Sequence, residues 1–195
     1  IAMVTMVIDH TACYFVSDGW QYECMRGIGR IAFPIFAFLI AEGYQHTRRK
    51  WDYGRNLLIF ASISEIPWML LHTDGSHNVL FTLLAGFCCI AILDKLKSHK
   101  ILPLLFVLVI ALATSALNTD YGIQGVALVM MFYLFKDKPL LQLLFALPLF
   151  YDFHPLGILA SLGIINLYNG ERGFIKGAYS KFLFYAFYPC NLMVI

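Results

Sequence analysis

Apolar residues gather in nine runs along this chain, and short polar segments separate each run from the next. The runs cover residues 1–16, 31–47, 54–72, 78–94, 101–117, 121–135, 139–151, 155–168 and 180–195. A membrane-spanning helix needs about 20 largely apolar residues, and inside lipid every backbone polar group must be bonded internally. The pattern therefore predicts an all-α, polytopic integral membrane protein, built as a single bundle of about nine transmembrane helices.

The breaks between runs carry turn-forming residues, such as Asp18-Gly19 and Asp74-Gly75. No internal repeat and no low-complexity linker divides the chain, so we expect one domain over residues 1–195. Ile1 and Ile195 both lie inside apolar runs, and we expect the natural chain to continue past each of them.

Composition supports the membrane class. The chain is 60% hydrophobic and only 13% charged, with 17 Phe and 11 Tyr, more than a soluble globule of 195 residues buries. The net charge of +2 gives no support for nucleic-acid binding. The five cysteines show neither a CxxC pair nor the spacing of a zinc site, so no metal centre is predicted.

Positive charge alternates along the loops. Twelve of the 14 Lys and Arg lie in or beside the loops that follow the second, fourth, sixth and eighth runs: Arg48, Arg49, Lys50, Arg55, Lys95, Lys97, Lys100, Lys136, Lys138, Arg172, Lys176 and Lys181. The opposite loops carry Asp18, Glu23, Asp74, Asp120, Asp152 and His154. Because short basic loops stay in the cytoplasm, the pattern predicts nine spans with the N-terminus inside.

Eight titratable residues interrupt the apolar runs or their ends: Asp9, His10, Arg26, Arg30, Glu42, His46, Glu65 and Asp120. Charges within a bilayer are costly, so such residues face a protein interior or a wet cavity. Polar contacts inside a helix bundle explain two or three of them. Eight favour a reactive or transporting cavity.

His10 is the candidate general base, because imidazole titrates near neutral pH; the alternative is a structural histidine bonded to a neighbouring helix. Asp9 adjoins His10, but adjacent helical residues point about 100° apart, so the orienting carboxylate is expected from another helix. At 1.5 Å per residue, His10 lies roughly 8–9 Å and Glu65 roughly 10 Å inside the outer boundary. Glu65 is therefore the predicted partner of His10, with Asp120 as second choice.

The cytoplasmic end of run 31–47 carries Glu42 and His46, which are four residues apart and share a helix face. They point toward Arg48, Arg49 and Arg55, and arginine binds phosphate through paired hydrogen bonds. The cluster is a candidate site for an anionic cytosolic ligand. The alternative is that these basic residues only set the topology.

Arg26 and Arg30 lie on the side of the membrane where basic residues are disfavoured. Gly27 and Gly29 between them permit close approach of a ligand or another helix. The two arginines either serve an outer site or pair with outer carboxylates. Further candidates for an outer, acceptor-binding cavity are Asn78, Thr82, Asp120 and Tyr121.

Several of these residues fall in blocks that resemble the TraX family. The first is Ile8-Asp9-His10, and the longest is 29–44, which reads GRIAFPIFAFLIAEGY. Later blocks follow in the family's order: His46-Thr47-Arg48, Ser64-Glu65-Ile66-Pro67, 78–82, Asp120-Tyr121-Gly122 and Tyr188-Pro189. The resemblance covers nearly the whole chain. It extends more distantly to the acyltransferase-3 and heparan N-acetyltransferase proteins.

The resemblance implies a membrane-embedded acetyltransferase of the bacterial cytoplasmic (inner) membrane. Such an enzyme moves an acetyl group from cytosolic acetyl-CoA to an amine or hydroxyl at the outer face, on the pilin N-terminus or a cell-surface molecule. His10 then becomes the catalytic histidine, and Arg48 with its basic neighbours contacts the coenzyme A phosphates. Arg26 and Arg30 flank the outer site. A cation or hydrogen-bond donor stabilises the oxyanion of such a reaction, and the candidates are Arg30, Asn78 and Tyr121.

The chain departs from the family pattern at one place, since Asn191 stands where a histidine is expected after Tyr188-Pro189. Two other functions remain open. A proton-coupled transporter also uses buried carboxylates and histidines, although the expected repeats and paired broken helices are missing. A non-catalytic membrane component of a conjugation or pilus system needs no catalytic histidine at all.

Overall fold

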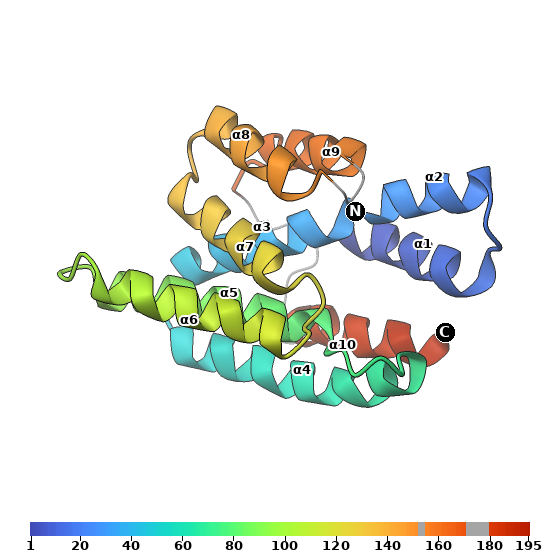
Figure 1. Cartoon of the computed structure of the whole chain (residues 1–195), viewed down its shortest axis with the longest axis horizontal. Helices are drawn as coiled ribbons and strands as arrows, with labels where there is room; N and C mark the ends of the chain where they lie inside the picture. Colours follow the sequence, from blue (N-terminus) through green and yellow to red (C-terminus); the bar gives the residue numbers. More distant parts are fainter. Residues whose placement is uncertain (152–154, 171–179) are drawn as a thin grey trace. The chain divides into compact units, whose positions relative to one another are not determined.

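The structure is a computed structural model that describes residues 1–151, 155–170 and 180–195. These residues form ten α-helices and no β-strand (Figure 1), which confirms the all-α prediction. The helices are α1 (Ala2–Phe15), α2 (Trp20–Gly29), α3 (Ala32–His46), α4 (Lys50–Leu71), α5 (Val79–Lys95), α6 (Leu102–Ala116), α7 (Gly122–Leu134), α8 (Pro139–Leu149), α9 (Pro155–Asn166) and α10 (Ser180–Val194).

Each of the nine apolar runs contains one helix, and α2 is the helix that the runs do not mark. It lies between the first two runs, and its polar residues include Gln21, Glu23 and Arg26. A helix of mixed polarity has no continuous apolar run, so hydropathy alone does not detect it.

Helix length supports one membrane span within the described ranges. The segment Trp20–His46, which comprises α2 and α3, has 27 residues and a mean hydropathy of 1.6, and it is long enough to cross a bilayer. Helices α6 to α9 are apolar but have only 11–15 residues. At 1.5 Å per residue they measure about 17–23 Å, less than the ~30 Å of a hydrocarbon core. Nine spans therefore stay a prediction.

The chain divides into two compact units. Unit 1 comprises Ile1–Phe36 and Phe135–Ile195, and unit 2 comprises Ala37–Leu134. The single domain expected from the sequence stays a prediction. Of the charged loop residues on which the topology rests, Asp152, His154, Arg172 and Lys176 lie outside the described residues, as does the side chain of Lys181.

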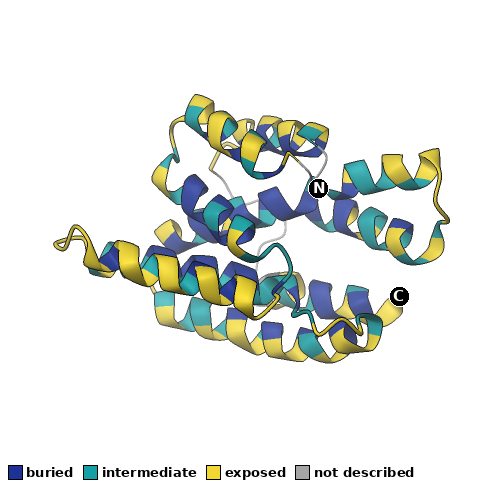
Figure 2. Cartoon of the chain, viewed as in Figure 1, coloured by how far each residue is buried: buried dark blue, intermediate teal, exposed yellow. Residues whose placement is uncertain are grey.

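In unit 2, α5 is the central helix and contacts α4, α6 and α7. The contact with α7 is close, because a methyl group at Gly86 would lie 2.8 Å from the side chain of Val129. Phe87 and Ile90 of α5 are buried in the same layer. Figure 2 shows how buried and exposed positions alternate along α4 and α6, as expected for helices that bury one face each. The central α5 has only buried and half-buried positions over residues 79–94.

In unit 1, α1 and α2 form an antiparallel hairpin, and α9 packs against both α8 and α2. The hairpin helices approach closely at Gly29, where a methyl group would overlap the side chain of Asp9. Helix α9 meets the end of α2 at Gly157, where a methyl group would lie 2.9 Å from Cβ of Arg30. The glycines thus serve contact between helices at these two points.

Candidate functional site

The turn between α4 and α5 holds a carboxylate–histidine pair in unit 2. Glu65 Oε1 lies 2.5 Å from His77 Nδ1, and Glu65 Oε2 accepts hydrogen bonds from the side chain and backbone N–H of Asn78. The Glu65 side chain is largely buried, with 16% exposed, whereas that of His77 is 43% exposed. Helix α4 places the carboxylate beneath a histidine that leans toward solvent.

Asn78 and Thr82 are polar residues of this region whose side chains are fully buried. The Asn78 side chain accepts from the backbone N–H of Leu80 at the start of α5 and donates to the Ala61 carbonyl. The Thr82 hydroxyl lies within hydrogen-bond distance of Thr119 Oγ1 and the Asp120 carbonyl. The structure thus brings the predicted residues of α5 to the α6–α7 loop, where Asn78 and Thr82 stabilise the fold. Their predicted part in acceptor binding stays a prediction.

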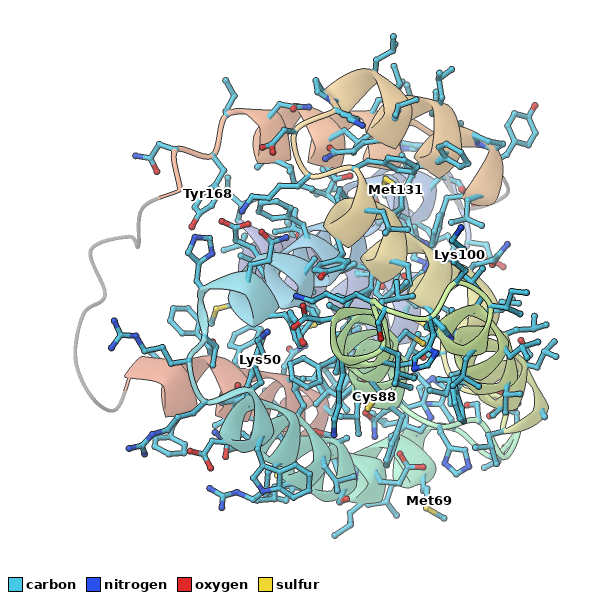
Figure 3. The ribbon with its side chains drawn as sticks, turned by 90° about the vertical axis from the view of Figure 1, so that its left-hand side faces the viewer. Lys50, Met69, Cys88, Lys100, Met131 and Tyr168 are labelled. Atoms are coloured by element: carbon cyan, nitrogen blue, oxygen red, sulfur yellow. The ribbon has the colours of Figure 1, made fainter. Side chains whose placement is uncertain are left out.

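Two neighbouring cavities open at this end of unit 2. One has a volume of about 240 Å³ and is lined by Glu65, His77 and Met69, among others. The second, about 290 Å³, includes the predicted residues Asp120 and Tyr121. His72 and Ser76 line both cavities. Figure 3 marks Met69 near the end of α4, on the side of this turn.

The loop that carries Asp120 has an unusual backbone. Asn118, Tyr121 and Gly122 all have φ between 41° and 62°. A left-handed conformation is uncommon for a bulky residue such as Tyr121, and residues held this way often occur at functional sites. Backbone hydrogen bonds from His77 to Asn118 and from Asp120 to His77 fix the loop beside the carboxylate–histidine pair.

The predicted ligand cluster lies at the opposite end of α4, also in unit 2. His46 Nδ1 is 3.3 Å from Glu42 Oε1, the i,i+4 contact that the spacing predicts. Arg55 pairs with Asp52 at 3.3 Å. The Arg49 side chain is 87% exposed and its contact with Asp52 is long, at 3.9 Å.

Lys50 belongs to a structural contact that the sequence did not reveal. Its Nζ lies 2.7 Å from Asp94 Oδ2 and 4.0 Å from the centre of the Tyr44 ring, and Tyr44 donates to the same Asp94 oxygen. The hydrogen bond to Asp94 raises the pKa of Lys50 above its usual value. The contact fastens α3, α4 and α5 together, and Figure 3 marks Lys50 at the start of α4. Asp94 closes an apolar helix beside Lys95, and no local signal indicates its partner.

The catalytic histidine implied by the TraX resemblance lies in unit 1. His10 Nδ1 is 2.6 Å from the side-chain amide of Asn191, so α1 and α10 meet at this ring. The rings of Tyr14 and Tyr188 lie 6.4 Å from it, centre to centre. Asn191, at the position where a histidine was expected, is therefore in direct contact with His10.

Asp9 and Arg26 form an ion pair of 2.8 Å inside the α1–α2 hairpin, and each side chain is 16% exposed. Arg26 thus pairs with a carboxylate, and its predicted part in an outer site stays a prediction. Arg30 caps the C-terminus of α2, where Gly157 of α9 approaches it.

The candidate residues thus fall into three groups: the His10 group in unit 1, and the cavity end and basic end of unit 2. Glu65 and His10 belong to different units, and their predicted pairing stays a prediction. Sequence reasoning missed His77, Asp94 and the contact of Asn191 with His10. The one available signal for His77 was its place beside Asn78 at the start of a helix.

Comparisons with known proteins match the whole chain. The family described as TraX protein matches residues 1–195. A curated relative, "Probable fimbrial assembly protein FimC, serogroup H1" of Dichelobacter nodosus, is 30% identical over 227 aligned positions, which cover 100% of this chain and 91% of the relative. No solved structure matches the chain.

Proposed function

The chain belongs to the TraX family, and from this premise we propose that it is a membrane-embedded acetyltransferase of a pilus or conjugation system. In this proposal, acetyl-CoA binds from the cytosol, and the acetyl group passes to an amine or hydroxyl at the outer face. The acceptor is a pilin N-terminus or a cell-surface molecule. The printed name of the relative, a fimbrial assembly protein, supports the coarser assignment to pilus assembly.

The contact between His10 and Asn191 carries the proposal. It joins the first and last helices of the matched sequence at a single imidazole. In the structure the Asn191 amide nitrogen faces Nδ1 and donates to it, so the neutral ring carries its proton on Nε2. In the proposed reaction the amide turns over, its oxygen accepts from an Nδ1–H group, and Nε2 then has the lone pair that proton transfer requires. His10 takes a proton from the attacking nucleophile in this scheme and delivers it to the leaving sulfur of coenzyme A.

The exposed face of α6 supports a lipid environment. Six of its large apolar residues are 47–62% exposed: Leu104, Leu105, Phe106, Leu108, Val109 and Leu112. The buried positions of the same helix are Pro103, Ala111 and Thr114. A helix that directs small residues inward and leucines outward is typical of a membrane protein, since water disfavours a large exposed apolar surface. We therefore propose multiple spans in the cytoplasmic membrane, with the N-terminus inside.

The basic end of unit 2 is the proposed site for the phosphates of acetyl-CoA. Arg48 and Arg49 are exposed there, and Arg48 forms no ion pair within the described part of the chain. Glu42, His46 and Arg55 surround the same end of α3 and α4. Attraction between exposed arginines and phosphates is screened by salt, so binding is expected to weaken as ionic strength rises.

Calorimetric titration of the purified protein with acetyl-CoA tests the proposal, together with transfer of a labelled acetyl group to a synthetic pilin N-terminal peptide. Replacing Arg48 and Arg49 by Ala should weaken binding about tenfold, at roughly 0.5–1 kcal/mol for each exposed charge pair. The matched control replaces Lys97 and Lys100, two exposed cations of the α5–α6 loop, and should leave binding unchanged. If both double variants bind acetyl-CoA as tightly as the wild type does, the two arginines serve only the topology.

The non-catalytic pilus component is the second candidate, and the name of the relative favours it. The two candidates differ in one measurement. If the wild-type protein binds no acetyl-CoA and transfers no acetyl group, the catalytic proposal is wrong and the assembly role remains.

A further inference from the structure

The Glu65–His77 pair is a carboxylate-held histidine that the proton-transfer scheme above does not use. An ionised carboxylate only accepts hydrogen bonds, so its contact with Nδ1 places the proton on that nitrogen. The other ring nitrogen, Nε2, then carries a lone pair. Nε2 makes no hydrogen bond within the described part of the chain, and the side chain is 43% exposed. This is the protonation state that a general base requires.

The ring is held from several directions. His77 is bonded through its backbone to the α6–α7 loop, with N to the Asn118 carbonyl at 3.0 Å and its carbonyl to the Asp120 N–H at 2.8 Å. Phe81 meets the ring edge to face, with centres 6.0 Å apart. Glu65 is itself fixed by Asn78. A base that is held in this way does not need to be ordered when a substrate arrives.

The surroundings of His77 are acidic. The titratable groups that line the two cavities beside it are Glu65 of α4, His72 and Asp74 of the α4–α5 turn, and Asp120 and Tyr121 of the α6–α7 loop. Neither cavity is lined by Lys or Arg among the described residues. Hydrogen bonds from the Ser76 side chain and backbone N–H hold the pKa of Asp74 below its usual value, which keeps that carboxylate ionised at neutral pH. Cavities with this acidic lining attract a cation and repel an anionic polymer.

We propose that the Glu65–His77 pair removes the first proton from the ammonium form of an amine acceptor. This inference rests on the proposed acetyl transfer. An N–H bond of R–NH₃⁺ breaks, its electron pair stays on the amine nitrogen, and the proton binds His77 Nε2. The imidazolium, stabilised by Glu65, then releases that proton to water. In the transfer itself the amine loses a second proton, which passes through His10 to the leaving sulfur. Overall, R–NH₃⁺ and acetyl-CoA give R–NH–CO–CH₃, coenzyme A thiol and one released proton.

The pH dependence of a variant tests the assignment. The probe is a lysine-free synthetic peptide with a free N-terminus, whose α-amino group is roughly one-twentieth unprotonated at pH 6.5 and about nine-tenths unprotonated at pH 9. His77→Gln should therefore slow transfer roughly tenfold to twentyfold at pH 6.5 and recover nearly the wild-type rate at pH 9, where solution removes the proton. Glu65→Gln, which keeps the shape of the side chain, should show a smaller loss at pH 6.5 and the same recovery.

Three further measurements make the result specific. His99→Gln, in the exposed α5–α6 loop, should match the wild type at both pH values. Glu65→Gln should add nothing in the His77→Gln background, because it acts through that ring. His10→Ala should stay slow at pH 9. Alkaline recovery also shows that a variant is folded.

Each alternative outcome is distinct. Full activity of His77→Gln at pH 6.5 would overturn the inference and leave the acetyltransferase proposal standing. An equal loss at both pH values would do the same, as expected for a structural residue or a hydroxyl acceptor. If the wild-type protein transfers no acetyl group to the peptide at either pH, both proposals fail.

Discussion

Asp9 and His10 are neighbours in sequence but take their partners from different helices. Asp9 contacts Arg26 of α2, whereas His10 contacts Asn191 of α10. The difference follows from helix geometry, because successive side chains point about 100° apart. The Asp9–Arg26 pair therefore stabilises the α1–α2 hairpin, and α10 determines the surroundings of the imidazole.

His10→Ala should reduce acetyl transfer roughly a hundredfold or more, the usual size of a general-base contribution, and leave acetyl-CoA binding nearly unchanged. Asn191→Ala should cause a smaller loss, and the double variant should behave as His10→Ala alone, since Asn191 acts through the ring. Asn166→Ala on α9 is the control. The measurement is the steady-state transfer rate of the four variants. If the loss in the double variant equals the sum of the two single losses in activation free energy, Asn191 acts independently of His10.

At the level of single elements, close helix contacts depend on individual glycines. Gly27 and Gly29 lie two residues apart on α2, yet only a methyl group at Gly29 meets the neighbouring helix. There it would overlap Asp9, whereas a methyl group at Gly27 has no atom within 4 Å. The α1–α2 hairpin thus has one position that excludes a side chain and one that tolerates it.

Gly29→Ala should destabilise the protein by about 1–3 kcal/mol, the usual cost of overpacking, because the methyl group pushes Asp9 away from Arg26. Gly27→Ala should stabilise it by up to about 1 kcal/mol, since alanine favours the helix more than glycine does. Thermal unfolding of the detergent-solubilised variants measures both. Similar melting temperatures for the two variants would contradict the close approach at Gly29.

Across the whole molecule, unit 2 has two chemically different ends. The α4–α5 hairpin places Lys50 and Asp94 at one end, beside Arg48 and Arg49, and the Glu65–His77 pair at the other. Helix α4 has 22 residues, which separate its two ends by about 33 Å, close to the thickness of a bilayer core. Basic residues at one end and acidic residues at the other fit a unit that crosses a membrane with its basic end inside.

Single-cysteine labelling in intact cells tests this orientation. Cysteines introduced in a cysteine-free background at residues 73–77 should react with a membrane-impermeant thiol reagent, and those at 95–100 should react only after lysis. Cysteines at 172–181 should likewise react only after lysis, and 172–179 of these positions lie outside the described residues. Labelling of 95–100 in intact cells would contradict the nine-span topology.

The sequence by itself determined the helices and the contacts within them. Each apolar run contains a helix, because hydropathy is a property of consecutive residues, and Glu42 meets His46 because one helical turn brings them together. The amphipathic α2 was not predicted, since its mixed polarity interrupts the apolar pattern. Family membership was also readable from the sequence, because its blocks follow one another along the chain.

Only the tertiary structure decided which polar residues meet. Depth along each helix predicted Glu65 as the partner of His10, and it gave no sign of His77, which reaches Glu65 because the α4–α5 turn folds back. Asp94 and Lys50 are 44 residues apart, and Asn191 and His10 are 181 apart. Such contacts depend on how the helices turn and pack, and no local pattern records that arrangement.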